Sequence, residues 1–305
     1  MEISNTTSKI TTGFKTARDK GQLIELTIKF GEAGKRRDKR ATQKVAEEYG
    51  ANEKRVMVQK DMLQSPNLKA AQQVALRLRN KMKHRLMPYG HGGTMYLPNS
   101  IEFEVKQGLD EGFSEMDEFM NKHFGQWSLL RQRWLDECGG LDDGTFPSEE
   151  RARQKYYRSW TVFQIPDVDN VWSGMTGKDA ERFAQEVKRS EQERSVHMVK
   201  EVASKVERVL SGIVAVGDYT VDTTGKKQNV FKDSRIQHAR DLAGLLDEYN
   251  ITNDPTLEDI RVRMLSEICP VDAGVLRESE GERKRVAASA SDMLGRLGMI
   301  GRTSD

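Results

Sequence analysis

Positively charged side chains gather in two stretches near the start of the chain. Such side chains can neutralise the phosphates of nucleic acid, and the counterions released on binding drive the association. Phosphate contacts of this kind carry no base specificity. The alternative is that both stretches are ordinary solvated faces. The predicted nucleic-acid-binding residues are Lys35, Arg36, Arg37, Lys39 and Arg40 in the first stretch, and Arg77, Arg79, Lys81, Lys83 and Arg85 in the second.

A third stretch interleaves cations with aromatic rings. This combination suits a nucleic acid whose bases stack on the rings while its phosphates meet the cations. The alternative, which we favour, is a solvated face whose rings belong to a core. The residues are Arg151, Arg153, Lys155, Tyr156, Tyr157, Arg158 and Trp160.

Hydrolytic chemistry has one weak candidate. Glu104-Val105-Lys106 matches half of a Mg-dependent nuclease site, where carboxylates bind the metal and the lysine stabilises charge at the phosphate. The aspartate that should complete the site is missing, because Asp61 has no motif around it. Acidic residues also stabilise the first turn of a helix, and we favour that interpretation.

Other catalytic signatures are absent from the sequence. The histidines and cysteines lack the spacing of a metal site. Neither Gly177-Lys178 nor Gly225-Lys226 has the spacing of a phosphate-binding loop. We therefore predict no catalytic residue, no metal and no cofactor, and keep a divergent Mg-dependent nuclease as an alternative.

Composition favours extended helices in a reducing compartment. Only 36% of the 305 residues are hydrophobic and 31% are charged, which suits helices that are mostly surface better than a thick enzyme core. The net charge of +2 hides an asymmetry, because residues 1–100 hold 20 Lys and Arg against 9 Asp and Glu, whereas residues 101–150 hold 4 against 13. Two distant cysteines, no signal peptide and no bilayer-spanning apolar run predict a cytoplasmic protein without membrane contact.

The elements that would position the cations begin after a predicted flexible tail at 1–20. Alternation from Leu23 to Phe30 predicts a half-buried strand, and a short helix at 41–49 should end at Gly50. A further helix should begin at Pro66, with Ser65 as its N-cap, and stop before Pro88. Its apolar stripe is Leu68, Ala71, Ala75, Leu78 and Met82, and a loop or tight hairpin follows at 89–98.

Two long amphipathic helices are predicted next, at about 99–137 and 178–213. They suggest a coiled-coil-like antiparallel hairpin with a small β tip at about 140–175, where Trp160, Val162 and Ile165 resemble a strand. Phe113, Trp127 and Trp134 on the first helix are predicted anchors for a protein partner or for a second copy of the chain.

Three shorter helices, near 233–249, 255–267 and 281–297, complete the chain, with Asp254 as the N-cap of the second. The predicted fold is mainly α: a basic α/β lobe at 21–98, the long helical hairpin at 99–213 and a C-terminal helical unit at 214–305.

Three stretches of the sequence resemble an uncharacterised family found in bacteriophages, conjugative plasmids and integrative elements. They are GEAGKRRDKR after the first strand, LMPYGHGGTMYLPNSIEF, and VFKDSRIQHARDLAGLLDEYNITNDPTLEDIR. The resemblance implies a bacterial host cell and genes for a MoxR/CobS-like AAA+ ATPase and a CobT-like von Willebrand factor A protein nearby. It implies no catalytic residues.

Together these observations predict a non-enzymatic, DNA-associated accessory protein of a mobile element, acting in replication, recombination or defence evasion. The alternative is an adaptor or scaffold that binds the AAA+ ATPase or a host protein through the helical hairpin.

Overall fold

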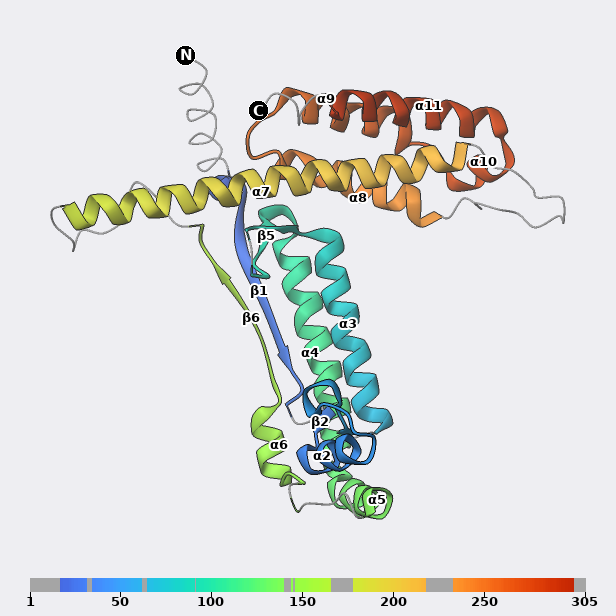
Figure 1. The fold of residues 1–305 in the computed structure, drawn as a ribbon. Coiled ribbons are helices and arrows are strands. Elements are labelled where there is room, and N and C mark those ends of the chain that lie inside the picture. Colours follow the sequence, from blue (N-terminus) through green and yellow to red (C-terminus); the bar gives the residue numbers. More distant parts are fainter. Residues whose placement is uncertain are drawn as a thin grey trace. The chain divides into compact units, whose positions relative to one another are not determined.

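The computed structural model describes residues 17–31, 35–61, 65–90, 92–139, 144, 146–165, 178–217 and 233–298. It is mainly helical, as predicted, with one small sheet and a separate strand pair (Figure 1). The chain divides into two compact units: unit 1 draws on Met1–Glu25, Arg85–Glu102 and Val162–Asp305, and unit 2 on Leu26–His84 and Phe103–Thr161. This division runs across the predicted ranges 21–98, 99–213 and 214–305, which stay a prediction.

Some predicted features fall outside the described residues. These are the tail at 1–16, much of the proposed β tip at 140–143 and 166–177, and the pair Gly225-Lys226.

Unit 2 contains several short elements and two of the longer helices. Its elements, some of which reach its boundary, are β1 (Gly21–Lys29), β2 (Lys35–Arg37), α2 (Lys39–Glu48), the 3-10 turn η1 (Glu53–Arg55), β3 (Gln59–Asp61), α3 (Pro66–Arg85), α4 (Glu102–Gly125), α5 (Trp127–Cys138), α6 (Glu149–Lys155) and β6 (Tyr157–Phe163).

Unit 1 contains a β-hairpin and a group of helices. Its elements are β4 (Met87–Pro88), β5 (Met95–Pro98), the 3-10 turn η2 (Asn99–Ile101), α7 (Lys178–Gly217), α8 (Asp233–Tyr249), α9 (Pro255–Arg263), the π-helical turn η5 (Met264–Ile268), α10 (Ala273–Glu278) and α11 (Glu280–Leu297).

The predicted first strand is confirmed as β1, which lies inside a four-stranded sheet of order β4-β5-β1-β6. It pairs antiparallel with β5, in a register that runs from Gly21 opposite Pro98 to Ile24 opposite Met95. A side chain at Gly21 would meet the Tyr96 ring and a backbone oxygen within 2.7 Å, so only glycine fits there. The strand expected around Trp160 also exists, but as β6 it joins this sheet beside β1 and does not form a separate tip.

The prediction for α3 is confirmed at its start and along its face. Ser65 Oγ accepts a hydrogen bond from the Leu68 amide at 3.0 Å, and Pro66 is the first helical residue. All five residues of the predicted stripe are buried. The helix ends before Pro88, and β4 and β5 then form an antiparallel hairpin around three glycines with positive φ.

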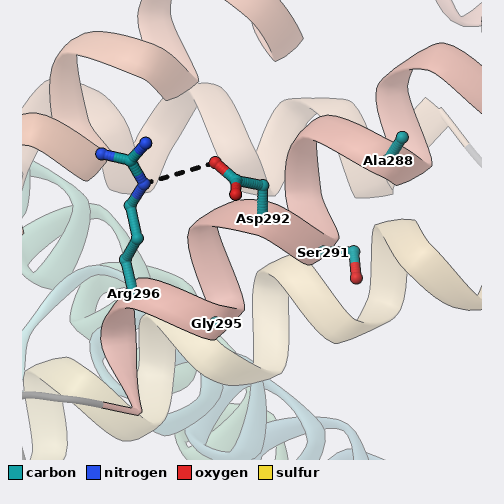
Figure 2. Close-up of a pocket in the computed structure, with 5 residues that line it drawn as sticks. All are labelled: Ala288, Ser291, Asp292, Gly295 and Arg296. Carbon is teal, nitrogen blue, oxygen red and sulfur yellow. Dashed lines mark hydrogen bonds and ion pairs between the residues drawn. The ribbon is translucent and has the colours of Figure 1, made fainter.

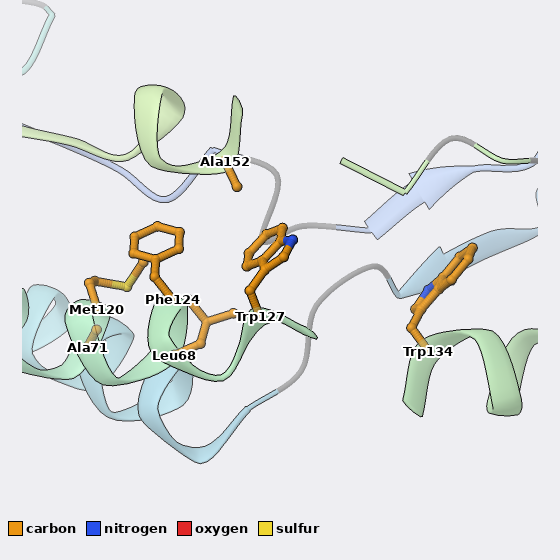
Figure 3. Packing of buried hydrophobic residues seen from close by; sticks show 7 residues of the cluster. All are labelled: Leu68, Ala71, Met120, Phe124, Trp127, Trp134 and Ala152. Carbon is orange, nitrogen blue, oxygen red and sulfur yellow. The ribbon is translucent and has the colours of Figure 1, made fainter. Parts of the chain in front are cut away.

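The helix predicted at about 99–137 is in fact three pieces. The 3-10 turn η2 precedes α4, and Gly125 and Gln126 separate α4 from α5. α3 and α4 run side by side (Figure 1), and Gly112 permits this because a Cβ there would lie 2.6 Å from a Leu78 methyl. One hydrophobic cluster of unit 2 joins these two helices to α5 and α6. Its buried residues are Leu68, Ala71, Met120, Phe124, Trp127, Trp134 and Ala152 (Figure 3).

A buried histidine packs against the aromatic side chains of this core. The His123 side chain is 1% exposed, and its Nδ1 lies 2.7 Å from Ser65 Oγ. That hydroxyl already accepts from the Leu68 amide, so its proton can be donated to a neutral His123 Nδ1. Burial lowers the pKa of His123 below its usual 6.5.

We therefore expect acidification to destabilise unit 2. Below pH 6.5 the unfolded chain takes up a proton on His123 that the folded chain resists, so stability falls until the pH passes the lowered folded-state pKa. Urea unfolding can be followed at about pH 7.5 and pH 5.5 by tryptophan fluorescence, because Trp127, Trp134 and Trp160 all lie in unit 2. The non-titrating variant His123→Gln should lose less stability over this range, and an equal loss would contradict the prediction.

The predicted antiparallel hairpin of two long helices is not confirmed. α4 and α5 belong to unit 2, whereas α7 belongs to unit 1 and packs there against α11 and α8. α7 runs along these two helices (Figure 1). On α7, Val202, Val206, Leu210 and Ile213 are buried, whereas Phe183 is partly exposed.

The three predicted C-terminal helices are confirmed as α8, α9 with η5, and α11. Asp254 caps α9 by accepting from the Thr256 and Leu257 amides. The short helices α6 and α10 were not predicted. Among the described residues, no helix is both long enough and apolar enough to span a bilayer.

Candidate nucleic-acid interface

The first predicted basic stretch belongs to a small structural motif within unit 2. We call residues 35–61 the basic motif; it comprises β2, α2, η1 and β3. β2 and β3 pair antiparallel, with Arg36 opposite Lys60 and Arg37 opposite Gln59. α2 and η1 form the connection between the two strands. The motif therefore holds residues from both of its ends and its middle close together.

A buried ion pair joins the start of α2 to β3. Lys60 Nζ lies 3.0 Å from an Asp38 carboxylate oxygen, and the two residues are only 4% and 7% exposed. The other Asp38 oxygen accepts from the Ala41 amide at 2.9 Å, so the same side chain is also the N-cap of α2. Asp38 is thus a single group on which both the helix and the strand depend.

Thr42 completes this junction. Its hydroxyl donates to the Asp38 carbonyl oxygen at 2.6 Å and accepts from the Val58 amide at 3.1 Å. The Asp38 amide in turn donates to the Val58 carbonyl oxygen at 2.9 Å. The start of α2, at Asp38 and Thr42, is therefore hydrogen-bonded to both the amide and the carbonyl group of Val58. These bonds fix where α2 begins.

The C-terminal end of α2 is equally well defined, as the predicted stop at Gly50 requires. Gly50 has a φ of 59°, its amide donates to the Glu47 carbonyl, and the Ala51 amide donates to the Ala46 carbonyl at 2.8 Å. These two bonds form a Schellman motif. The Asn52 side chain then caps η1 by accepting from the Lys54 amide at 3.0 Å. Tyr49, between helix and glycine, is 75% exposed.

Six cations of the basic motif point into solvent. No described residue forms an ion pair with any of them, although Glu47, Glu48 and Glu53 lie in the same stretch. They are Arg37, Lys39 and Arg40, which were predicted, and Lys44, Lys54 and Arg55, which were not. Lys35 and Arg36 lie on β2, but their side chains are outside the described part of the structure.

The second predicted basic stretch does not form one open surface. Arg77 makes an ion pair with Glu115 on α4, and Arg79 donates to the Ile28 carbonyl oxygen at 3.1 Å. Lys81 approaches α4 at Gly108, while Lys83 is exposed. Arg85 is half-buried and belongs to unit 1. Alternate residues of a helix point in different directions, so five basic residues at spacing two are spread around α3.

Acidic residues of α4 hold part of the third stretch, but the favoured interpretation is only partly correct, because Tyr157 is 51% exposed and does not lie in a core. Arg158 forms an ion pair with Asp117, and Tyr156 Oη donates to the same carboxylate at 3.1 Å. The hydrogen bond from Arg158 keeps the pKa of Asp117 below its usual value. Trp160 Nε1 donates to Asp110 at 2.9 Å. These cations and rings serve the internal structure of unit 2.

The predicted partner anchors are core residues. Phe113 lies under the Arg158 guanidinium at 4.8 Å, Trp127 packs against Phe146 at 5.7 Å, and Trp134 packs against the same ring at 5.2 Å. All three are buried within unit 2. The face of α4 and α5 that carries these three residues is therefore covered by the chain itself.

The nuclease half-motif lies on a helix. Glu104 is exposed in the first turn of α4 and Lys106 lies over the Trp160 ring at 5.7 Å, which agrees with the favoured interpretation of a helix start. The described residues contain no group of three or more His, Cys, Asp or Glu placed to hold a metal ion.

A surface hollow of about 660 Å³ lies on α11 in unit 1. Ala288, Ser291 and Gly295 line it beside Asp292 and Arg296, which pair at 3.3 Å (Figure 2). Asp292 also pairs with Arg263, and Arg296 with Asp259 at 3.1 Å. Because both charged groups already have partners, we do not assign this hollow as the site.

The basic motif is the better candidate, because it combines open positive charge with an exposed ring on a well-defined backbone. Such a surface can bind phosphates and stack on a base. Its exposed cations form no ion pair with described acidic residues, so no such pair has to break on binding. Tyr49, Lys44, Lys54 and Arg55 were missed because their exposure depends on tertiary packing. No family model matches this chain, and no curated protein and no solved structure matches it either.

Proposed function

We propose that this chain is a non-enzymatic, DNA-associated accessory protein of a phage or other mobile genetic element, acting in replication, recombination or defence evasion. The basic motif is its nucleic-acid interface, and contact is made to phosphates without base specificity. The link to mobile elements rests on the three resembling sequence stretches.

One observation carries the nucleic-acid proposal: the six exposed cations of the basic motif have no ion-pair partner among the described residues. Elsewhere on described surfaces many arginines are paired, for example Arg153 with Glu149 and Arg189 with Glu193. Unpaired cations lose no protein partner when they meet a phosphate. They can therefore release counterions from nucleic acid without a competing internal cost.

Removing four of these cations should weaken binding and reduce its dependence on salt. The test variant is Lys39→Gln, Arg40→Gln, Lys54→Gln and Arg55→Gln together. The slope of log affinity against log salt is negative, and each lost phosphate contact reduces its magnitude by about 0.7–0.9. Fluorescence anisotropy with labelled DNA between about 50 and 200 mM salt measures both quantities.

The matched control removes the same charge elsewhere. Arg131, Arg133, Lys188 and Lys200 are also exposed and have no ion-pair partner among the described residues, and replacing all four with Gln changes the net charge equally. This control should keep most of its affinity. Equal losses of affinity in both variants would show that net charge, and not the basic motif, determines binding. If the parent protein does not bind DNA at low salt, the proposal is refuted.

A second candidate function is an adaptor for a MoxR-like AAA+ ATPase or a host protein. The observation that favours it is a group of exposed apolar side chains on consecutive elements of unit 1, Val262 on α9, Leu265 on η5 and Val275 on α10. Single exposed apolar residues are common, but Val262 and Leu265 are three residues apart on one continuous helical run, so their side chains are neighbours, as on a docking surface. Co-purification with the ATPase, with and without ATP, tests this function, and loss of the complex in a Val262→Ser, Leu265→Ser variant would locate the contact.

A further inference from the structure

We propose that the basic motif prefers single-stranded DNA to the duplex and that the ring of Tyr49 is the platform on which one base stacks. This inference rests on the proposed function and names the class of substrate. It uses a residue that contributes no charge and that phosphate binding alone does not require.

The position of Tyr49 shows that its ring is not used for folding. Thr42 and Ala46 are buried on the inner face of α2, and Tyr49 follows them at helical spacing on the same stripe. A ring that served the core would be covered like its neighbours, yet this one is 75% exposed. By contrast, Tyr89, Tyr96 and Tyr249 are all almost completely buried.

The backbone that carries the ring is fixed before any ligand arrives. The Schellman motif closes α2 directly after Tyr49, and the Asn52 cap starts η1 three residues later. A ring on a bonded backbone loses little freedom when a base stacks on it, so more of the contact energy is kept as affinity.

Cations and a second exposed apolar side chain follow immediately. Lys54 and Arg55 lie on η1, five and six residues after Tyr49, and Met57 is exposed just beyond them. Because a chain spans at most about 3.3–3.6 Å per residue, the Cα atoms of Lys54 and Arg55 lie within roughly 20 Å of the Tyr49 Cα atom. One short segment of nucleic acid can therefore place a base on Tyr49 while its neighbouring phosphates meet Lys54 and Arg55.

The geometry selects between the two forms of DNA. In a duplex both faces of each base are covered by its neighbours in the stack, so Tyr49 has no face to meet and only the cations contribute. In a single strand the bases can unstack and offer a face to an aromatic side chain. The ring should therefore add affinity for single strands alone.

The test compares Tyr49→Ala with the parent protein on three probes of equal length, about 20 nucleotides: oligothymidylate, a duplex, and a single strand that lacks bases. Anisotropy at low salt should show tighter binding of oligothymidylate than of duplex. Tyr49→Ala should weaken oligothymidylate binding about 5- to 150-fold and leave duplex binding unchanged. The strand without bases should bind parent and variant equally, because it offers nothing to stack.

Two further variants make the result specific. Tyr49→Trp keeps a stacking surface and should retain the preference for single strands. Tyr157→Ala removes another exposed tyrosine of unit 2, outside the basic motif, and should change nothing. Equal loss on oligothymidylate and duplex, or no loss on either, would overturn the role of the ring while leaving the cationic interface intact. Failure of the parent protein to bind any probe would refute the proposed function itself.

Discussion

Replacing Asp38 with Ala is expected to destabilise the basic motif by about 3–5 kcal/mol, because the change removes the carboxylate that pairs with the buried Lys60 ammonium. The same substitution removes the N-cap of α2, since the Ala41 amide loses its acceptor. Hydrogen exchange of the Ala41, Thr42 and Val58 amides is the direct measurement, because these groups surround the junction. Their protection should fall far more than that of amides in α8.

Companion variants separate the charge from the cap. Asp38→Asn keeps an N-cap side chain but removes the charge, so it should be less damaging than Ala. The double variant Asp38→Asn, Lys60→Met removes both buried charges and should recover much of the loss, as replacement of a whole buried pair often does. If the double variant is no better than Asp38→Asn alone, the ion pair is not what holds α2 to β3.

The effect on DNA binding distinguishes structure from charge. Removing an aspartate makes the basic motif more positive, so charge alone predicts tighter binding of DNA to Asp38→Ala. If the motif must be folded to present its cations and Tyr49, binding should instead weaken. Anisotropy with the oligothymidylate probe decides between these opposite signs.

Local signals explain which elements the sequence could predict. The stripe of α3, the Ser65 cap with Pro66 and the Asp254 cap with Pro255 each depend on residues a few positions apart, and each is confirmed. The stop of α2 at Gly50 belongs to the same class. Periodicity and caps are written within one or two turns, so they can be interpreted without knowledge of the fold.

Non-local pairing explains what was missed. The register of Gly21 with Pro98 joins residues far apart in the chain, and nothing near either of them specifies it. The same holds for Arg77 with Glu115, which makes part of the second predicted basic stretch an internal contact, and for Trp160 with Asp110 in the third stretch. Conversely, Tyr49 continues the buried stripe of α2, so periodicity alone would have placed it in the core.

The predicted anchor Trp127 gives a second large effect, in which burial within the chain and contact with a partner lead to different results. Its ring is buried and meets His123 and Phe124 at 5.9 Å each, as well as Phe146. Trp127→Ala should therefore destabilise unit 2 by about 3–5 kcal/mol, through lost burial and the cavity left behind. Urea unfolding followed by the remaining tryptophans of unit 2, Trp134 and Trp160, measures this change.

Leu129→Ala is the matched control, because Leu129 lies two residues further along α5 and is largely exposed. Its change in stability should stay within about 0.5 kcal/mol. An anchor reserved for a partner would behave in the opposite way: Trp127→Ala would leave the isolated chain as stable as before and lose only the complex. If Trp127→Ala leaves the free energy of unfolding unchanged, the ring does not stabilise the core of unit 2. The protein-binding surface would then lie on α5 and not on α9 and α10.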